Sequence, residues 1–281
     1  MTDIDSEGAL AAYYAIGGGF GTVPSISIVL PAKNESRNLA HVFGTIPEWI
    51  DEVVLVDGHS TDDTVAEARR LLPTVKVVHQ PGKGKGDALR AGFEAAKGDI
   101  IVMMDADGST DGAEIPRFVA ALTTGADFAK GSRFASGGGS DDITFSRRLG
   151  NHILSTLVNI LFKTRYTDLC YGYNAFWTKH LDKLDLDCAG FEIETVMNVR
   201  AAKAGLAIQE IPSYEYLRLH GMSNLKVFRD GIRIGKFIIR ERLSGGSAAQ
   251  QAAMRTSRTT EQHAGFGHGN GEDLQGTSSV A

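Results

Sequence analysis

Short apolar runs alternate with helical patterns through the first half of the chain, and this alternation constrains the fold most strongly. Strands are predicted at residues 25–30, 52–56, 75–79 and 100–104, and helices from Ser36, from Thr61 and over 85–97. The run at 100–104 (IIVMM) is apolar at every position, which is typical of a central strand in a parallel sheet. Strand–helix alternation of this kind forms right-handed βαβ units. We therefore predict an α/β, Rossmann-like fold with a mostly parallel central sheet flanked by helices.

Local signals place several boundaries of these elements. Pro31 is expected to stop the first strand, and Ser36 is expected to cap the helix that follows. The second half is less regular, with strands predicted at 126–131 and 207–211 and helices at 147–162, 192–204 and 225–242. Residues 1–23 end in a glycine-rich stretch and are predicted to be a flexible extension. Residues 244–281 have few large apolar side chains and are predicted to be a disordered tail, which leaves 24–243 as a single domain.

Charge and cysteine content narrow the class of protein. The formal net charge is −5, so nothing favours nucleic acid as a partner. The two cysteines, Cys170 and Cys188, lack zinc-site or disulfide-framework spacing, which favours a reducing compartment. The first residues do not resemble a secretory signal, and no apolar run reaches the roughly 18 residues of a spanning helix. We expect a cytoplasmic protein that does not cross a membrane by itself, although a peripheral position at its inner face stays open.

Acidic and turn-forming residues follow the predicted strands at the point where each strand ends. Pro31 and Glu35 follow the first strand, Asp57 follows the second, and Asp105 and Asp107 follow the fourth. In open parallel sheets, ligands bind at the carboxyl ends of the strands. A polar ligand and a metal ion are therefore predicted at this edge.

The Asp105-Ala106-Asp107 sequence is the best candidate for the metal ligands. Two carboxylates one residue apart can converge on Mg²⁺ or Mn²⁺, which prefer oxygen ligands and complete their shells with water and substrate phosphates. Such a cation neutralises the charge that develops on a diphosphate leaving group. The alternative is that Asp107 only begins a turn, but its place after a buried strand favours the metal.

The glycine-rich basic loop at 81–86 (PGKGKG) leads into a predicted helix. It lacks the spacing of a Walker A loop. Since helix N-termini favour anions, the loop is a candidate phosphate site. A flexible solvated turn is an equal alternative.

Seven segments, taken in order, resemble glycosyltransferase family 2, which has the GT-A fold. They are SIVLPAKNESRNL, VVLVDGHSTDDT, GKGKGDALRAGFEAAKGD, VMMDADGS, KGSRF, TDLCYGYNAF and RLHGMSNL, between residues 27 and 225. The resemblance is closest to the branch that holds the dolichol-phosphate mannose synthases and other polyprenyl-phosphate glycosyltransferases. It implies a hexosyltransferase that uses a nucleotide-sugar donor.

The resemblance also implies roles at matching positions. The implied nucleotide-binding residues are Pro31, Ala32, Glu35, Asp57, Lys85, Asp105 and Ala106. The implied metal ligands are Asp105 and Asp107, and the implied catalytic residues are Arg133, facing the sugar or phosphates, and Asp168, as a base. Residues implied near the acceptor or the diphosphate are Ser109, Arg147, Arg148, Glu192, Glu194, Arg218, His220 and Ser223.

Two positions depart from the family pattern. Asp57 is followed by Gly58 and His59, where the family often has a second aspartate. His59 is best explained as a turn residue. Asn224 stands where the branch usually has lysine, and an amide brings no charge to a diphosphate. Arg218 is a candidate to compensate.

Two helical segments are candidates for contact with a membrane surface. The segment 149–162 is apolar around most of its circumference, and 225–242 alternates basic and apolar residues. Core packing and a solvated charged face are the alternatives. A basic amphipathic helix suits an anionic membrane surface, which we favour here.

Together these features predict a metal-dependent, inverting transfer of a hexose from a UDP- or GDP-sugar to a polyprenyl phosphate. A soluble hydroxyl compound is the alternative acceptor, and such an acceptor would need Asp168 as a base more than an ionised phosphate would. A sugar nucleotidyltransferase would carry a glycine-rich basic loop after the first strand, where this chain has PAKNE. A non-catalytic nucleotide-sugar binding module is disfavoured by the intact aspartate pair. The sequence gives no indication of the oligomeric state.

Overall fold

The computed structural model describes residues 23–221 and 227–244. The predicted N-terminal extension and C-terminal tail, together with Ser223 and Asn224, lie outside these residues except for Val23 and Ser244 at their margins. The described residues up to Ile238 belong to one compact unit, and the described part of a second unit is the helical end of the chain, from Ile239 to Ser244.

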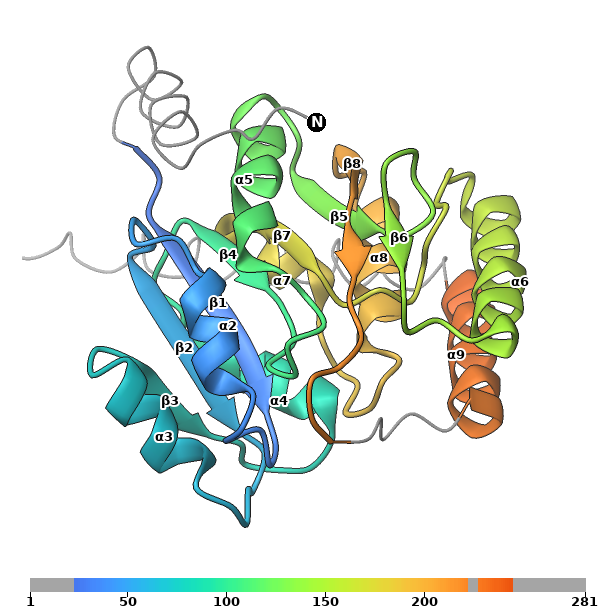
Figure 1. The fold of residues 1–281 in the computed structure, drawn as a ribbon. Coiled ribbons are helices and arrows are strands. Elements are labelled where there is room, and N and C mark those ends of the chain that lie inside the picture. Colours follow the sequence, from blue (N-terminus) through green and yellow to red (C-terminus); the bar gives the residue numbers. More distant parts are fainter. Residues whose placement is uncertain (1–22, 222–226, 245–281) are drawn as a thin grey trace, which may run out of the picture. The chain divides into compact units, whose positions relative to one another are not determined.

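A seven-stranded sheet runs through the first unit in the order β3-β2-β1-β4-β7-β5-β8 (Figure 1). Its strands are β1 (Ile26–Ala32), β2 (Glu52–Asp57), β3 (Lys76–His79), β4 (Ile100–Met103), β5 (Phe128–Ser132), β7 (Asn174–Trp177) and β8 (Ile208–Pro212). All are parallel except β7, which is antiparallel to both β4 and β5. A second, two-stranded sheet pairs β6 (Gly139–Ser140) with β9 (Tyr214–Glu215). The predicted α/β fold with a mostly parallel sheet is confirmed.

Helices cover both faces of the sheet, which explains why its central strand β4 is apolar at every position. The helices are α2 (Leu39–Thr45), α3 (Thr64–Leu71), α4 (Lys85–Ala95), α5 (Ile115–Thr123), α6 (Phe145–Phe162), α7 (Leu181–Leu184), α8 (Ile193–Lys203) and α9 (Val227–Leu243). Short 3₁₀ turns, η1 (Gly112–Glu114) and η2 (Thr178–His180), precede α5 and α7. Val102 packs into the core beneath α2 and α5, whereas Ile101 packs into the core beneath α4 and α8.

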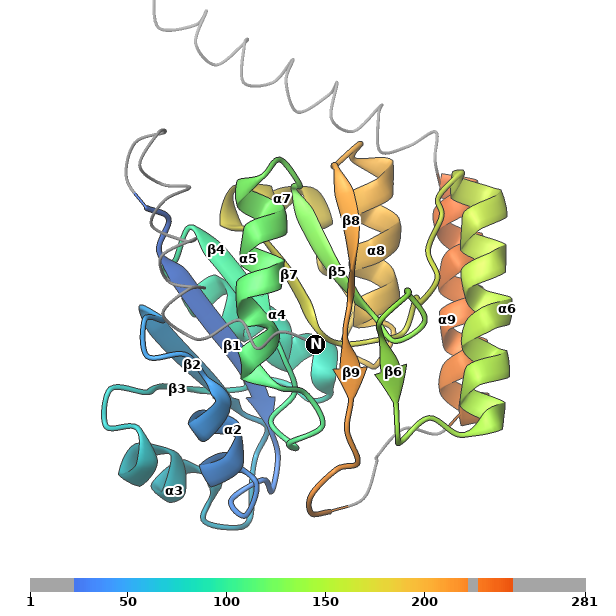
Figure 2. The same ribbon diagram turned by 45° about the horizontal axis from the view of Figure 1, so that its top comes forward.

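A third apolar cluster lies outside the sheet and joins α6, α8 and α9. Val158 of α6, Val196 and Val199 of α8, and Ile234 and Phe237 of α9 are buried together. The two views show α6 and α9 side by side beyond α8 (Figures 1 and 2). Part of the apolar surface predicted for these helices therefore packs internally.

Three predicted boundaries were wrong, and one of them is the start of the helix predicted from Thr61, which begins at Thr64. Strand β1 continues through Pro31 to Ala32, because Val29 bonds toward β4 and Ala32 toward β2. The backbone of Pro31 is directed toward β4, like that of Val29, but the pairing with β4 ends at Val29 and Met103. The N–H that proline lacks is therefore not needed for a hydrogen bond between the strands. Helix α2 begins at Leu39 rather than at Ser36, whose hydroxyl instead donates to Asp62.

Candidate active site

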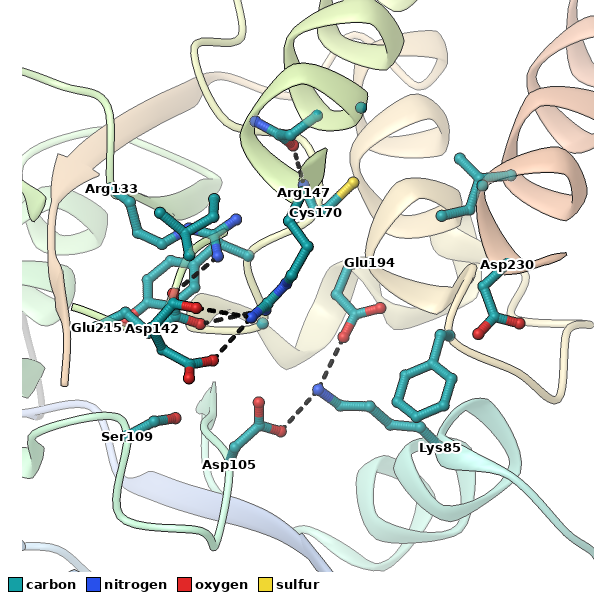
Figure 3. Close-up of a pocket in the computed structure, with 18 of the residues that line it drawn as sticks. Lys85, Asp105, Ser109, Arg133, Asp142, Arg147, Cys170, Glu194, Glu215 and Asp230 are labelled. Atoms are coloured by element: carbon teal, nitrogen blue, oxygen red, sulfur yellow. Dashed lines mark hydrogen bonds and ion pairs between the residues drawn. The ribbon is translucent and has the colours of Figure 1, made fainter. Parts of the chain in front are cut away.

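A cavity of about 160 Å³ opens at the carboxyl edge of the sheet (Figure 3). Lys85 enters it from the start of α4, and Asp105 and Asp107 enter from the loop after β4. The second half of the chain supplies further lining residues, which are Arg133 after β5, Arg147 of α6, Glu194 of α8, Glu215 of β9 and Arg218. The cavity therefore collects side chains that are far apart in the sequence.

Asp105 is held by the ammonium group of Lys85. The Lys85 Nζ lies 2.6 Å from Asp105 Oδ1 and 2.8 Å from Glu194 Oε1. Burial alone would lower the pKa of Lys85, but these two carboxylates outweigh it and raise that pKa, so the side chain is charged. Gly172 leaves the space beside it open, since a Cβ there would come 2.9 Å from Nζ.

Asp107 is held by the guanidinium of Arg218 at 2.6 Å. Its other oxygen accepts hydrogen bonds from the Ser109 amide and hydroxyl, at 2.9 and 2.7 Å. Burial raises the pKa of Asp107, and the neighbouring charge of Asp105 raises it further, against the opposing effect of Arg218. The two aspartates therefore repel each other in a poorly solvated place, where a cation is stabilising.

The charges that line the cavity fit a divalent cation. Four basic and six acidic side chains line it, which leaves a formal charge of −2. Within residues 23–221 and 227–244, no group of three or more His, Cys, Asp or Glu side chains is arranged to hold a metal. Two carboxylates completed by phosphate oxygens and water form the kind of site that Mg²⁺ commonly uses. The side chains present thus fit a divalent cation whose remaining positions water or a diphosphate would fill.

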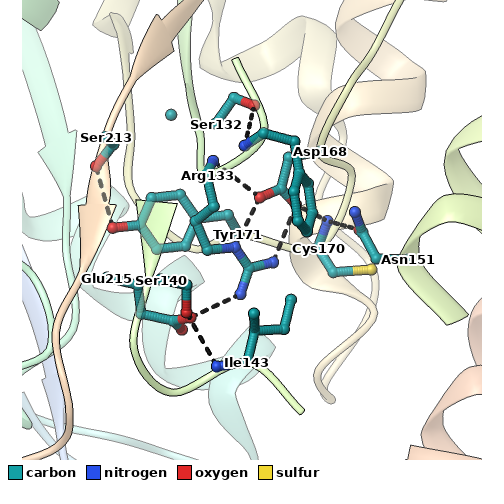
Figure 4. A network of polar contacts seen from close by, with 12 residues as sticks. Ser132, Arg133, Ser140, Ile143, Asn151, Asp168, Cys170, Tyr171, Ser213 and Glu215 are labelled. Carbon is teal, nitrogen blue, oxygen red and sulfur yellow. Dashed lines mark hydrogen bonds and ion pairs between the residues drawn. The ribbon is translucent and has the colours of Figure 1, made fainter. Parts of the chain in front are cut away.

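Arg133 is buried beside the cavity in a network of carboxylates (Figure 4). Its Nε and Nη2 donate to the two oxygens of Asp168 at 2.7 and 3.0 Å, and its Nη1 donates to Glu215 at 3.0 Å. Its guanidinium also lies 4.9 Å from the centre of the Tyr171 ring. Burial alone would raise the pKa of Asp168, but Arg133 outweighs it and lowers that pKa. Asp168 is therefore an anion that is fully buried and bound at two points.

Arg147 and Arg148 point to different places. Arg147 lines the cavity, where it pairs with Asp142 at 2.7 Å and approaches Glu215 at 3.7 Å. Arg148 lines a separate groove beside α6, and its guanidinium lies 5.6 Å from the centre of the Phe134 ring. Of the two predicted acceptor arginines, only Arg147 reaches the cavity.

The residues predicted to bind the nucleotide divide into two groups. Lys85 and Asp105 line the cavity, whereas Pro31, Ala32, Glu35 and Asp57 lie at the ends of β1 and β2, outside its lining. Glu35 lies 3.6 Å from the guanidinium of Arg218, which connects the groups. The pKa of Glu35 is raised to about 7, chiefly because burial disfavours the carboxylate. Ala106 is buried in the core beneath α2 and α5.

The glycine-rich loop packs against the chain itself. The Gly86 amide donates to the Ala189 carbonyl at 3.0 Å, and the Gly82 amide donates to Asp87 at 2.7 Å. Gly84 has a φ of 95°, a left-handed conformation that favours glycine. The loop is therefore an ordered turn that places Lys85, and these two amides are not free for an anion.

Three other predicted residues lie away from the cavity lining or outside the described part of the chain. Glu192 lies 3.5 Å from Arg233 of α9. His220 contributes its backbone carbonyl, which accepts a hydrogen bond from Asn38 at 3.2 Å. Ser223 lies outside the described residues, whereas Ser109 does line the cavity.

Sequence reasoning missed Asp142 and Glu215. Both line the cavity and neutralise its arginines. Asp142 precedes α6 in an irregular segment, where no local pattern indicates a site. Glu215 lies four residues beyond the predicted strand at 207–211, and this position past a strand end is the signal that could have identified it.

Comparisons with known proteins place the chain in a family. The family model described as glycosyl transferase family 2 matches residues 27–185. Glycosyltransferase AglJ of Haloferax volcanii is 32% identical over 216 residues, which cover 75% of this chain and 69% of the relative. Polyprenol monophosphomannose synthase of Mycolicibacterium smegmatis is 30% identical over 232 residues, covering 77% of this chain and 88% of the relative.

The fold is also found among solved structures. Glucosyl-3-phosphoglycerate synthase from Mycobacterium tuberculosis, solved with Mn²⁺, UDP and phosphoglyceric acid, superposes with a TM-score of 0.64. It is 22% identical, and the match covers 87% of this chain and 84% of the other. A cavity at the carboxyl edge of a mostly parallel sheet, together with a family match over more than half of the chain, identifies this protein as a member of glycosyltransferase family 2 and a hexosyltransferase.

Proposed function

We propose that this protein transfers a hexose from a UDP- or GDP-sugar to a polyprenyl phosphate, with inversion at the anomeric carbon and with a divalent cation. The observation that carries the proposal is the cavity itself, which is lined by the aspartates Asp105 and Asp107 together with the arginines Arg133 and Arg147. Support comes from the polyprenol monophosphomannose synthase relative. The structural neighbour that was solved with Mn²⁺ and UDP supports the cation and the nucleotide.

The donor diphosphate is proposed to lie over the aspartate pair. A bound divalent cation would neutralise the charge on the departing nucleoside diphosphate. Lys85 and Arg218 flank the pair, 2.6 Å from Asp105 and from Asp107 respectively, and would donate to the phosphate oxygens. Charges fixed in a poorly solvated site are effective because they need no rearrangement during the reaction.

The acceptor is proposed to approach along the opposite wall, where Arg147 would bind its phosphate. Arg147 is part-buried and enters the cavity from the first turns of α6. A polyprenyl phosphate is already ionised near neutral pH, so its oxygen can attack without a base. A soluble phosphorylated acceptor is the alternative, which the phosphoglyceric acid bound to the structural neighbour favours.

Asp168 is proposed to position Arg133 rather than to remove a proton. Its two oxygens are occupied by Arg133, it is absent from the cavity lining, and its lowered pKa makes it a weak base. Arg133 is then held rigidly toward the sugar or the phosphates. A rigid donor loses little entropy when it binds a charged group.

A membrane surface is proposed to supply the lipid acceptor at α6. Phe145, Leu149, Ile153 and Ile160 of this helix are exposed, by 81%, 49%, 57% and 72%. Arg148 and His152 lie on the same helix and are exposed as well. Among the described residues, no helix is long and apolar enough to cross a bilayer. An exposed apolar stripe flanked by basic groups suits the surface of an anionic membrane.

The decisive experiment measures nucleoside diphosphate release from a panel of UDP- and GDP-hexoses. Each donor is tested with Mn²⁺, with Mg²⁺ and with EDTA, and with or without a short-chain polyprenyl phosphate. Release that requires both the cation and the lipid phosphate supports the whole proposal. Release that is unchanged by the lipid phosphate but rises with a soluble phosphorylated acceptor rejects the polyprenyl phosphate as the acceptor. Equal release in EDTA rejects the cation.

A further inference from the structure

Each aspartate of the proposed metal pair shares its basic partner with a second carboxylate. Lys85 bridges Asp105 and Glu194, with 2.6 and 2.8 Å between the charged atoms. Arg218 bridges Asp107 and Glu35, at 2.6 and 3.6 Å. Each bridge thus consists of a cation, a predicted metal ligand and a further acidic residue that is not one of the predicted metal ligands.

These bridges bear directly on cation binding. The oxygens that Lys85 and Arg218 hold belong to the carboxylates that a divalent cation would need. A carboxylate that is buried without a counter-charge is costly, so a basic partner stabilises each aspartate when no metal is bound. The same partner must withdraw before the metal can bind at full strength. Withdrawal costs little if a second carboxylate is already in contact.

We propose that Lys85 and Arg218 are internal counter-cations for the aspartate pair, and that Glu194 and Glu35 are positioning residues that receive them when a divalent cation binds. The inference rests on the metal-dependent part of the proposed function. Glu194 and Glu35 then hold the two basic side chains beside the diphosphate, so that the positive charges of Lys85 and Arg218 are available to its phosphate oxygens.

The backbone around both side chains is fixed, so the exchange needs only side-chain movement. Tyr216 and Leu219 donate backbone hydrogen bonds to the carbonyls of Ser109 and Asp107, at 2.9 and 3.4 Å. These bonds anchor the segment that carries Arg218 to the loop that carries the aspartates. Lys85 is the first residue of α4, and Gly172 leaves room beside its ammonium group.

The test measures Mn²⁺ binding in the absence of nucleotide, by electron paramagnetic resonance of the free ion. We expect Arg218→Gln and Lys85→Gln each to lower the Kd for Mn²⁺ by roughly fivefold to tenfold, because a competing charge is removed from a partly buried site. Arg147→Gln is the matched control, since Arg147 lines the same cavity but pairs with Asp142 and Glu215. Its Mn²⁺ affinity should change less than about twofold.

Nucleotide binding should respond in the opposite direction. With saturating Mn²⁺, Arg218→Gln and Lys85→Gln should weaken UDP or GDP binding by roughly tenfold, because the released cations no longer meet the diphosphate. A Kd for Mn²⁺ that stays the same or rises in both variants would overturn the inference. An increase in Mn²⁺ affinity in the Arg147→Gln control as large as in the test variants would also overturn the inference, because the effect would then be that of net charge alone.

A double-mutant cycle tests the receiving role of Glu194. If Glu194 receives Lys85, Glu194→Gln should raise the Kd for Mn²⁺ more in the wild-type chain than in the Lys85→Gln background. If Glu194 acts only through its charge, the two increases should be equal, and the receiving role is rejected. The same cycle applies to Glu35 and Arg218.

The outcomes separate this inference from the proposed function. Tighter Mn²⁺ binding by the variants, without sugar transfer by the wild-type protein, would support the inference and reject the transfer reaction. Sugar transfer by a wild-type protein that binds no Mn²⁺ would reject the inference and leave the transferase in place.

Discussion

The guanidinium of Arg133 and the carboxylate of Asp168 form a two-point ion pair, at 2.7 and 3.0 Å, with Asp168 completely buried. Removing one member of a buried pair leaves the other without compensation, at a cost of about 3–5 kcal/mol. We expect Asp168→Ala to lower the free energy of unfolding by about this amount, measured in urea or guanidinium chloride. If Asp168 were a free base, Asp168→Asn would abolish transfer with the unfolding free energy unchanged.

The aspartate pair is expected to carry the dependence on a divalent cation. Asp105→Ala and Asp107→Ala should each reduce nucleoside diphosphate release by about 100-fold or more, since fixed charge at a leaving group is a large catalytic effect. Asp111→Asn is the control, because Asp111 lies in the same loop and its side chain accepts a hydrogen bond from the Ala113 amide, which an amide oxygen can also do. Unaltered release with unaltered cation dependence in Asp105→Ala would refute the assignment.

Glu35 should make stability depend on pH. Its pKa is raised from 4.5 to about 7, chiefly by burial, with the charges of Asp107 and Asp105 adding to the rise. Between these values the folded protein binds more protons than the unfolded chain, so the stability that Glu35 contributes is present below pH 4.5 and is lost as the pH rises toward 7. The unfolding free energy of the wild type relative to Glu35→Gln should therefore fall from about pH 5 to about pH 8. A difference that is flat or rises with pH would contradict this prediction.

Gly84, which precedes α4, and Gly86, in its first turn, should tolerate no side chain. Gly84 has a φ of 95°, and a Cβ on Gly86 would lie 2.5 Å from the Cys188 carbonyl oxygen. Alanine at either position should lower the unfolding free energy by about 1–3 kcal/mol. A Cβ added to Gly235 in α9 would meet nothing within 4 Å, so Gly235→Ala should instead stabilise by about 0.5–1 kcal/mol. Thermal unfolding of the three variants compares them directly.

Arg147 and Arg148 should have separable effects. Under the proposed function, Arg147→Gln raises the KM for a lipid phosphate by roughly tenfold, because a charged hydrogen bond to phosphate is lost. Arg148→Gln should leave that KM nearly unchanged in detergent but weaken flotation with anionic liposomes, which depends on exposed charge. Equal changes of KM in detergent for the two variants would reject separate roles for Arg147 and Arg148.

The part of the cavity that follows β1 to β4 could be predicted from sequence because its signals are local. The strand before Asp105 is apolar at every position, and the two aspartates follow it directly. Adjacent residues therefore predict both the strand and the candidate metal ligands. The same holds for Lys85, which begins a helix of clear periodicity. Because ligands bind at the carboxyl ends of parallel strands, the sequence then predicts that these residues lie together.

The part of the cavity formed after β4 could be predicted only in part, because tertiary contacts determine it. Strand β7 has four residues and runs against its neighbours, which no periodic pattern in so short a segment indicates. The pairing of Glu215 with Arg133 joins residues 82 positions apart. Asp168 matched a catalytic position by resemblance, yet its bidentate contact with Arg133 appears only in three dimensions.

The reversed direction of β7 has a consequence for how substrate choice can change. Because β7 runs opposite to β4 and β5, the segment that leads into it reaches the same edge as the ends of its neighbours. The segment before β7 thereby brings Cys170, Tyr171 and Gly172 into the cavity lining, and this segment lies outside the β1–β4 half of the chain. Under the proposed roles, Lys85 and the aspartates come from the stretch up to β4, and Arg147 comes from a later stretch that also supplies Arg218 to the donor diphosphate. A chimera joined between β4 and β5 should therefore exchange acceptors and keep its nucleotide sugar when the new later stretch carries an arginine at the position of Arg218.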